Sequence, residues 1–150
     1  MRQILLLLFL FTLSVAGIAQ TNTSQSVKTE KVRKKPYKIV IQMISKAPSD
    51  HAGLMRQLNN ITSTAPKGTQ VEIVCHGGGL EMLVNDKSSV KADVEKYIQQ
   101  GVQFVACEFT MKREQVTKDM LIKDTGSVQS GVLELADKQD KGWAYIKAGN

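Results

Sequence analysis

Residues 70–80 read QVEIVCHGGGL, and this stretch indicates how the rest of the chain is organised. A short run rich in valine and isoleucine reaches a cysteine and is then stopped by a histidine and three glycines. Such a run, bounded by glycine, is typical of a buried strand. Three similar runs are also expected to be strands: residues 37–45 (YKIVIQMIS), 102–107 (VQFVAC) and 143–147 (WAYIK).

The segments between these runs carry helical patterns. Leu54, Leu58 and Ile61 recur at helical spacing after a turn signal at residues 48–50, and Pro66 ends this helix. The remaining elements are expected as follows: a short helical turn at 80–84, helices from Ser88 or Ser89 to Gln100, at 112–121 and at 128–138, and a loop at 123–127. Strands that alternate with helices pair in parallel, so the sequence predicts an α/β fold with helices on both sheet faces.

Residues 1–19 have a short positive start and an apolar run that ends in Ala16-Gly17-Ile18-Ala19. This layout is typical of a secretory signal peptide that is cut before Gln20. The apolar run is shorter than the ~18–20 residues that a membrane span needs, although an uncleaved N-terminal anchor is the alternative. We therefore expect an exported protein, periplasmic or secreted, with no transmembrane segment after signal cleavage.

Residues 20–36 are polar and basic, and they predict a flexible tether before a single domain at residues 37–150. The basic cluster at residues 31–35 could touch an anionic lipid or polymer, but a solvated leader is the simpler interpretation. The formal net charge of +6 belongs to these N-terminal segments, because residues 39–150 hold equal numbers of acidic and basic side chains. Nucleic-acid binding is not expected, since it needs lysine and arginine clustered on one face.

Three segments should follow the carboxyl ends of predicted strands: residues 45–51, 75–79 and 107–110. Ligands of open parallel sheets bind at that edge, so we expect the three segments to converge. His76 comes directly after a strand, where its ring can reach a pocket. Gly77, Gly78 and Gly79 would let the backbone approach a bound group and offer N–H donors, although tight-turn geometry explains them equally well.

Cys107 is the first candidate for chemistry, because it ends a strand that is predicted to be buried. Lys112 and Arg113 follow, at the predicted start of a helix. A cation or a helix N-terminus favours the thiolate form, which makes a cysteine a nucleophile or a sulfur acceptor. The alternative is an inert cysteine that packs as a small apolar residue.

Other pairings of reactive residues are weaker. An exported protein permits a disulfide between Cys75 and Cys107 if their strands are neighbours. A metal could use both cysteines with His76 and His51, but the spacing matches no zinc motif, so no metal or other cofactor is expected. Asp50 is expected to cap a helix and His51 to be exposed. The chain has no G-x-S-x-G sequence that would indicate a hydrolase.

Four runs, in this order, resemble the DsrE/DsrF-like family, and more closely its small, often exported and largely uncharacterised branch: residues 74–80 (VCHGGGL), 101–111 (GVQFVACEFTM), 131–135 (GVLEL) and 139–146 (QDKGWAYI). The resemblance covers essentially residues 37–147. It implies a single-domain α/β fold with a largely parallel five-stranded sheet. It also implies homo-oligomers, commonly trimers or hexamers. Apart from the resemblance, the place of Trp143 and Tyr145 on the last predicted strand favours core or subunit contacts over a ligand cage.

The same resemblance suggests a sulfur site. In the sulfur-relay members, a cysteine near the end of a central strand accepts sulfur as a persulfide and passes it on, and Cys107 matches that position. The resemblance implies that His76 faces the same pocket and that Thr110 lines it. Relay members are cytoplasmic, whereas this chain is expected to be exported. Cys75 stands where an aliphatic residue is expected, which keeps the disulfide with Cys107 open.

The leading interpretation is an exported DsrE-like sulfur carrier or relay protein. In it Cys107 accepts sulfur, His76 polarises the thiol or orients a small sulfur species, and the glycines supply backbone donors. One alternative is a non-catalytic, oligomeric module that binds a small anionic ligand. Another is a reversible disulfide between Cys75 and Cys107. A carrier or a binding protein is expected rather than a turnover enzyme.

Overall fold

The computed structural model describes residues 35–149. It contains a five-stranded sheet with the order β4-β3-β2-β1-β5. The strands are β1 (Lys38–Met43), β2 (Gln70–Cys75), β3 (Gln103–Cys107), β4 (Gly126–Val128) and β5 (Ala144–Ala148). All four pairings are parallel, which confirms the predicted sheet. The predicted signal peptide and almost all of the predicted tether lie outside the described residues.

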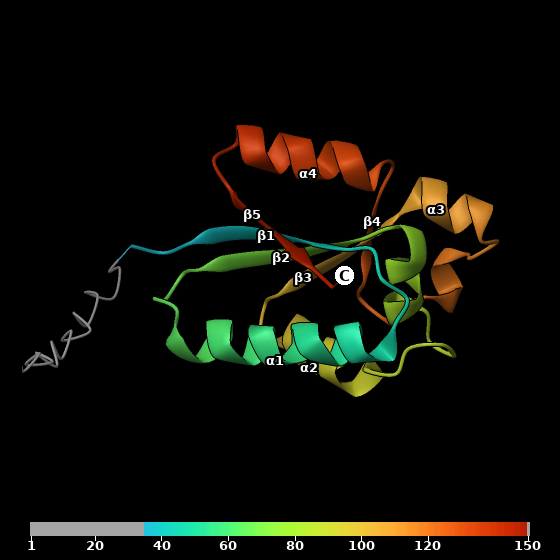
Figure 1. Ribbon diagram of the computed structural model, residues 1–150, viewed down its shortest axis with the longest axis horizontal. Helices are drawn as coiled ribbons and strands as arrows, with labels where there is room; N and C mark the ends of the chain where they lie inside the picture. Colours follow the sequence, from blue (N-terminus) through green and yellow to red (C-terminus); the bar gives the residue numbers. More distant parts are fainter. Residues whose placement is uncertain (1–34, 150) are drawn as a thin grey trace, which may run out of the picture. The chain divides into compact units, whose positions relative to one another are not determined.

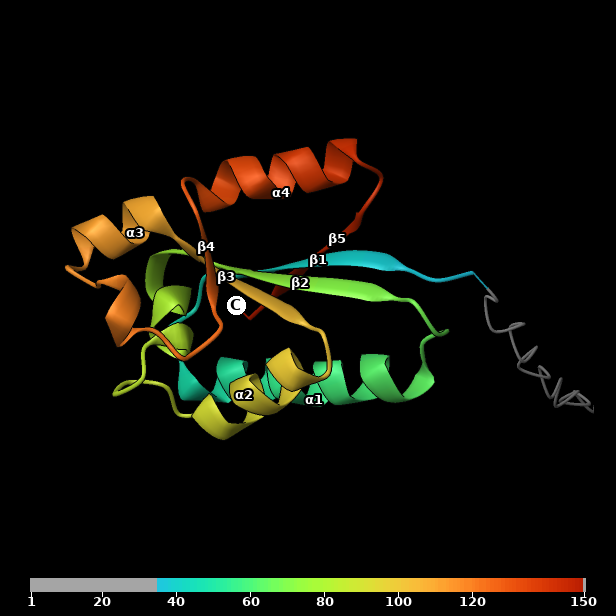
Figure 2. The ribbon, with the colours of Figure 1, turned by 180° about the vertical axis from the view of Figure 1, so that it is seen from behind.

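Helices cover both faces of this sheet, as predicted. They are α1 (Pro48–Thr64), α2 (Lys91–Gln99), α3 (Glu108–Arg113) and α4 (Gly131–Asp140), with 3-10 turns η1 (Gly77–Leu83) and η2 (Lys118–Met120). Helices α1 and α2 lie on one face and α4 on the other (Figure 1). The rear view in Figure 2 shows α3 and η1 at the end of the sheet where β2 and β3 finish. Within residues 35–149, no helix is long and apolar enough to cross a membrane.

The two faces of the sheet differ in what they bury. Side chains alternate along a strand, so Ile39, Ile41 and Met43 of β1 enter a large apolar core with α1, α2 and η1. Beneath α4 the fully buried apolar cluster is small: Val40, Val74 and Leu135, with Val105 and Trp143 partly buried at its edge. The α4 face therefore has room for polar side chains.

A buried ion pair fastens α4 to its face of the sheet. Glu72 of β2 is 3% exposed, and its Oε2 accepts a hydrogen bond of 2.5 Å from Lys138 Nζ of α4. The same ammonium lies 3.5 Å from Glu134 Oε1 and 4.3 Å from the centre of the Trp143 ring. Burial raises the pKa of Glu72, and the hydrogen bond and charge of Lys138 oppose that rise. Glu72 Oε1 is buried without a hydrogen-bond partner.

Three sequence-based boundaries were wrong. The helix expected at 112–121 is α3, which begins directly after β3 and ends before Gln115, where φ is +54°. The loop expected at 123–127 contains the first residues of β4. The last helix begins at Gly131 rather than at residue 128, because Val128 pairs with Cys107 in the sheet. Ser130 caps that helix by accepting a hydrogen bond of 3.4 Å from Leu133 N–H.

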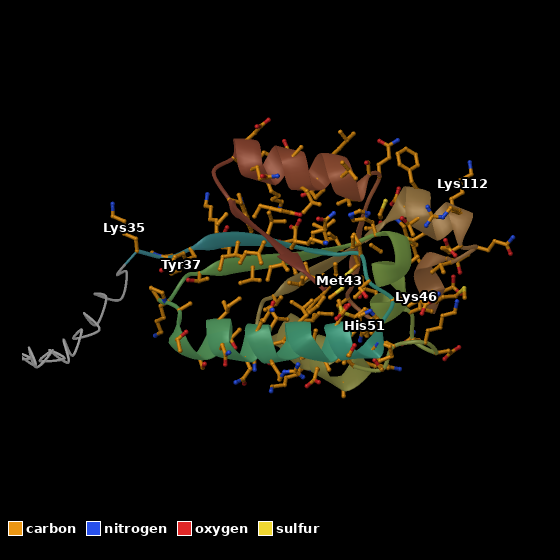
Figure 3. The ribbon with its side chains drawn as sticks, viewed as in Figure 1. Lys35, Tyr37, Met43, Lys46, His51 and Lys112 are labelled. Atoms are coloured by element: carbon orange, nitrogen blue, oxygen red, sulfur yellow. The ribbon has the colours of Figure 1, made fainter. Side chains whose placement is uncertain are left out.

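The prediction for His51 was also wrong. His51 is only 2% exposed, because it lies in the first turns of α1, which pack under the end of β1. Its Nε2 lies 2.9 Å from the carbonyl oxygen of Ser45. Figure 3 shows His51 near Met43 and Lys46, at the carboxyl end of β1, whereas Tyr37 lies at the opposite end of that strand. Asp50 is in the first turn of α1, and Ala47 is the residue at the cap position.

Candidate functional site

Cys107 lies at a junction between β3, α3 and α4. It is the last residue of β3 and the N-cap of α3, with extended backbone angles (φ −76°, ψ 117°). Its side chain points to the α4 face, and the residue is 5% exposed. A Cβ added to Gly131, the first residue of α4, would lie 3.3 Å from Cys107 Cβ. A glycine at this position therefore lets α4 begin close to the thiol.

Hydrogen bonds make the Cys107 thiol more acidic than an ordinary cysteine. Burial by itself raises its pKa, but the backbone N–H groups of Gly131, Thr110 and Phe109 and the Thr110 hydroxyl together bring the pKa below its usual value of 9.0. These N–H groups belong to the first turns of α3 and α4, where backbone donors have no partner inside the helix. The thiol contacts Gln129 O only at the long distance of 4.0 Å.

The cations that the sequence suggested do not account for this acidity. Lys112 and Arg113 are in the last turn of α3, not the first, and both are exposed. Arg113 pairs with Glu114 at 2.8 Å, and Figure 3 shows Lys112 on the outer side of α3, away from the sheet. The thiolate is stabilised by backbone and hydroxyl donors instead.

Thr110 connects the thiol to the glycine turn. It is buried, its hydroxyl donates toward the Cys107 sulfur, and its Oγ1 accepts a hydrogen bond of 3.2 Å from Gly77 N–H. The structure therefore brings Cys107, Thr110 and the start of η1 together, at the edge where the sequence placed them.

The three glycines are required by the backbone path and by close packing. Gly77 has a φ of +55°, and a Cβ on Gly78 would lie 3.0 Å from the carbonyl oxygen of Ile44. Gly79 is the most restricted, since its Cβ would lie 2.2 Å from the carbonyl oxygen of Met43. Gly77 and Gly78 also line a cavity of about 220 Å³ whose other residues are Lys46, Leu80, Glu81, Val84, Lys87, Glu114 and Val116.

His76 flanks the same junction as Cys107. A Cβ on Gly131 would lie 3.2 Å from His76 Cβ, so α4 begins over both residues. The side chain is half-buried, and this burial lowers the pKa of the imidazole below 6.5. Its Nε2 lies 2.7 Å from Gln42 Nε2. The neutral ring is therefore the favoured form near neutral pH.

Gln42 and Tyr145 are site residues that the sequence analysis missed. The Tyr145 hydroxyl donates to Gln42 Oε1. The sequence analysis expected a core or subunit contact for Tyr145 and did not anticipate this hydrogen bond. A glutamine among the apolar residues Ile39–Met43 of β1 was the available signal. Gly131, which lies against Cys107, was noticed only as part of a family motif.

Cys75 and Cys107 are both free cysteines. Cys75 pairs in register with Ala106, the residue before Cys107, and both Cys75 and Ala106 enter the large core under α1 and α2. The two sulfur atoms therefore lie on opposite faces of the sheet, and the structure does not bring them together for a disulfide. In residues 35–149 no group of three or more His, Cys, Asp or Glu side chains is arranged to hold a metal ion.

The fold and the site together describe a small parallel α/β protein with a hydrogen-bonded cysteine at the carboxyl edge of its sheet. A model of the DsrE/DsrF-like family matches residues 38–148. The chain belongs to this family, which confirms the resemblance seen in the sequence.

Two solved structures are similar to this chain. MTH1491 from Methanobacterium thermoautotrophicum, a protein of unknown function, is 29% identical with a TM-score of 0.70, over 74% of this chain and 98% of that one. BT1422 from Bacteroides thetaiotaomicron, a conserved protein of unknown function, is 14% identical with a TM-score of 0.60, over 73% and 93%, and it shares the fold. No curated protein shows significant similarity to the sequence.

Proposed function

We propose that this protein is an exported sulfur carrier or relay protein in which Cys107 holds sulfur as a persulfide. The DsrE/DsrF-like family, to which the chain belongs, is associated with sulfur relay. One observation carries the proposal: donors from Gly131, Thr110 and Phe109 lower the pKa of Cys107 in spite of its burial. A thiolate is the nucleophilic form that sulfur transfer requires.

The proposed step is a thiol exchange on sulfane sulfur. The Cys107 thiolate attacks the outer sulfur of a small persulfide or polysulfide, and an S–S bond to Sγ forms. The S–S bond of the donor breaks, and the donor leaves as a thiolate that takes a proton from water. An acceptor thiolate removes the outer sulfur by the same reaction in reverse. One S–S bond forms for each that breaks, so no oxidant or reductant is consumed.

The location and the partners are part of the proposal. Residues 1–19 support export, so the donor would be a small sulfur species of the periplasm or the medium. Phe109, Val132 and Leu133 support a homo-oligomer, a trimer or hexamer, because these apolar side chains are exposed next to the thiol. A partner that covers them would also exclude water from the persulfide.

The test is the intact mass of the mature protein, beginning at Gln20, after exposure to polysulfide. We expect the wild type and Cys75→Ala to gain sulfur that a reductant removes. Cys107→Ser should gain none, with an unchanged circular dichroism spectrum. Sulfur on Cys75 would move the role to that residue. No gain in the wild type, with the thiol shown to be free, would refute the proposal.

The cavity beside Gly77 and Gly78 supports a second candidate function, in which the protein binds a small anion without catalysing a reaction. Lys46 and Lys87 line this cavity and would attract such a ligand, whereas Glu81 and Glu114 of the same lining would oppose it. Calorimetry with thiosulfate tests the idea. Binding that survives in Cys107→Ala and is lost in Lys46→Met would favour the module, whereas an absence of heat in the wild type would reject thiosulfate as its ligand.

A further inference from the structure

Three side chains form a hydrogen-bonded chain across neighbouring strands on the α4 face. Tyr145 is on β5, Gln42 is on β1, and His76 follows β2 directly. The Tyr145 hydroxyl donates to Gln42 Oε1, and Gln42 Nε2 lies 2.7 Å from His76 Nε2. Figure 1 shows β5, β1 and β2 side by side, so the chain leads from the edge of the sheet to the site.

The orientation of the Gln42 amide sets the direction of each hydrogen bond, because the phenol and the imidazole can each donate or accept. Gln42 uses its carbonyl oxygen to accept from the phenol, which leaves its NH₂ group facing the imidazole. An amide NH₂ can only donate, so His76 Nε2 must accept with its lone pair. A neutral imidazole carries one proton, and that proton is therefore on Nδ1.

The position of Gln42 indicates why a polar residue occurs there. Its neighbours Ile41 and Met43 are fully buried in the large core, whereas Gln42 is half-buried and on the α4 face with His76. An apolar residue at this place would leave His76 Nε2 without its donor. The ring could then carry its proton on either nitrogen.

We infer that Gln42 and Tyr145 are positioning residues that hold His76 as a neutral imidazole with its proton on Nδ1. The ring then carries its N–H donor on Nδ1, and the lone pair of its Nε2 is occupied by the Gln42 amide. This inference rests on the proposed function for its consequence: a donor at this place selects an anionic sulfur species, such as a hydropolysulfide, over a neutral disulfide.

The other histidine provides an internal reference. The chain contains two histidines, and His51 Nε2 lies 2.9 Å from Ser45 O, a group that can only accept. His51 must therefore carry a proton on Nε2. The two rings should show opposite tautomers in one spectrum.

The experiment is a long-range proton–nitrogen correlation spectrum of the mature protein at neutral pH. We expect the wild type to show Nδ1–H for His76 and Nε2–H for His51. In Gln42→Glu the carboxylate can only accept, so the His76 proton should move to Nε2. Gln42→Leu should give a mixture, and Tyr145→Phe a smaller change, since the amide can still donate.

The matched control is Gln139→Leu, because the Gln139 amide donates to Leu135 O in the last turns of α4, whereas His76 lies near Gly131 at the start of that helix. It should leave both rings unchanged, and His51 should be constant in every variant. A wild-type His76 protonated on Nε2 would overturn the inference. So would a His76 tautomer that is the same in Gln42→Glu and Gln42→Leu as in the wild type.

Sulfur loading gives a second, separate readout. Gln42→Glu should load hydropolysulfide onto Cys107 roughly ten-fold more slowly, the order of effect expected when a charged group loses one hydrogen bond. A changed tautomer with an unchanged loading rate would overturn the positioning role. If the wild type never loads sulfur, the proposed function fails, while the nitrogen spectrum still decides whether Gln42 sets the His76 proton.

Discussion

Cys75 and Cys107 end neighbouring strands and are both buried, yet the groups that face their sulfur atoms differ. Cys75 is 0% exposed and points into the large apolar core, and burial raises its pKa far above the usual value. Cys107 is nearly as buried, at 5%, but its pKa is lowered. Burial alone therefore does not decide whether a cysteine is reactive.

The difference arises from what faces each sulfur atom. Under α1 and α2 the sheet meets apolar side chains, which cannot stabilise an anion. Under α4 the sheet meets the first turns of two helices, whose N–H groups have no partner within the helix and point at Cys107. One face of the sheet thus packs against the large apolar core and the other holds the reactive thiol, and four experiments test that division.

The largest expected effect is the difference in reactivity between the two thiols. With iodoacetamide near neutral pH, the native protein should be modified at Cys107 at least about a thousand-fold faster than at Cys75, since the thiolate is the reacting form. Peptide mapping measures both rates. In denaturant the rates should become equal, and equal rates in the native protein would contradict the comparison.

The second effect concerns the ion pair that fastens α4. Lys138→Met leaves Glu72 buried without its partner and should lower the free energy of unfolding by about 3 kcal/mol at neutral pH. Lys141→Met is the control on the same helix, because its pair with Asp137 is exposed and its loss should change stability far less than the loss of Lys138. Urea denaturation measures the free energy of unfolding of both variants. Equal losses of stability in the two variants would contradict a stabilising role for the buried Glu72–Lys138 pair.

The pH dependence of Lys138→Met has a definite sign. Lys138 opposes the raised pKa of Glu72, so its loss moves that pKa further above 4.5. The folded variant then binds a proton more tightly than the unfolded chain does. Its free energy of unfolding should therefore fall as the pH rises from 4.5 through the raised pKa, and the loss relative to wild type should be smallest in acid.

The third effect sharpens the role of Thr110. Thr110→Val removes the hydroxyl that donates to Cys107 and accepts from Gly77 N–H. The pKa of Cys107 should rise, because the thiolate loses one hydrogen bond from a hydroxyl donor. Thiolate absorbance in a Cys75→Ala background measures it. Thr110→Ser keeps the hydroxyl, so its thiol should titrate like that of the wild type. Identical titration curves for the wild type, Thr110→Val and Thr110→Ser would show that the Thr110 hydroxyl does not stabilise the thiolate.

The smallest effect compares two helical glycines. Gly53 in α1 has only Arg56 Nη2 near an added Cβ, at 3.7 Å, so Gly53→Ala should stabilise the protein by about 0.5–1 kcal/mol. An alanine at Gly131 would crowd Val74, His76 and Cys107 at 3.2–3.3 Å. Gly131→Ala should therefore not stabilise the protein as Gly53→Ala does, and it should raise the pKa of Cys107 slightly. Equal stabilisation with an unchanged thiol titration would contradict this account.

Much of the fold was predictable because its central strands are short apolar runs with clear ends. Strand β4 was not, since Gly126, Ser127 and Val128 are too few to show an alternation. Helix α3 was misplaced because Phe109 and Thr110 favour strands by themselves. In the structure Cys107 is both the last residue of β3 and the N-cap residue of α3, so no loop separates the strand from the helix.

The site was predictable where it follows from topology and not where it depends on distant partners. Cys107, His76 and Thr110 lie at strand ends, and parallel strands bring their carboxyl ends to one edge. Gln42 is 34 residues from His76 and 103 from Tyr145 along the chain. Such bonds depend on strand order and register, which no local pattern contains.

The pairing of Cys75 with Ala106 has one further consequence. A shift of one residue between β2 and β3 would turn every side chain of β3 to the opposite face. Cys107 would then enter the apolar core and lose its donors, although the strand itself would be intact. The alkylation rate of one thiol therefore reports strand register, and it offers a simple probe of correct assembly during refolding or in redesigned versions of this sheet.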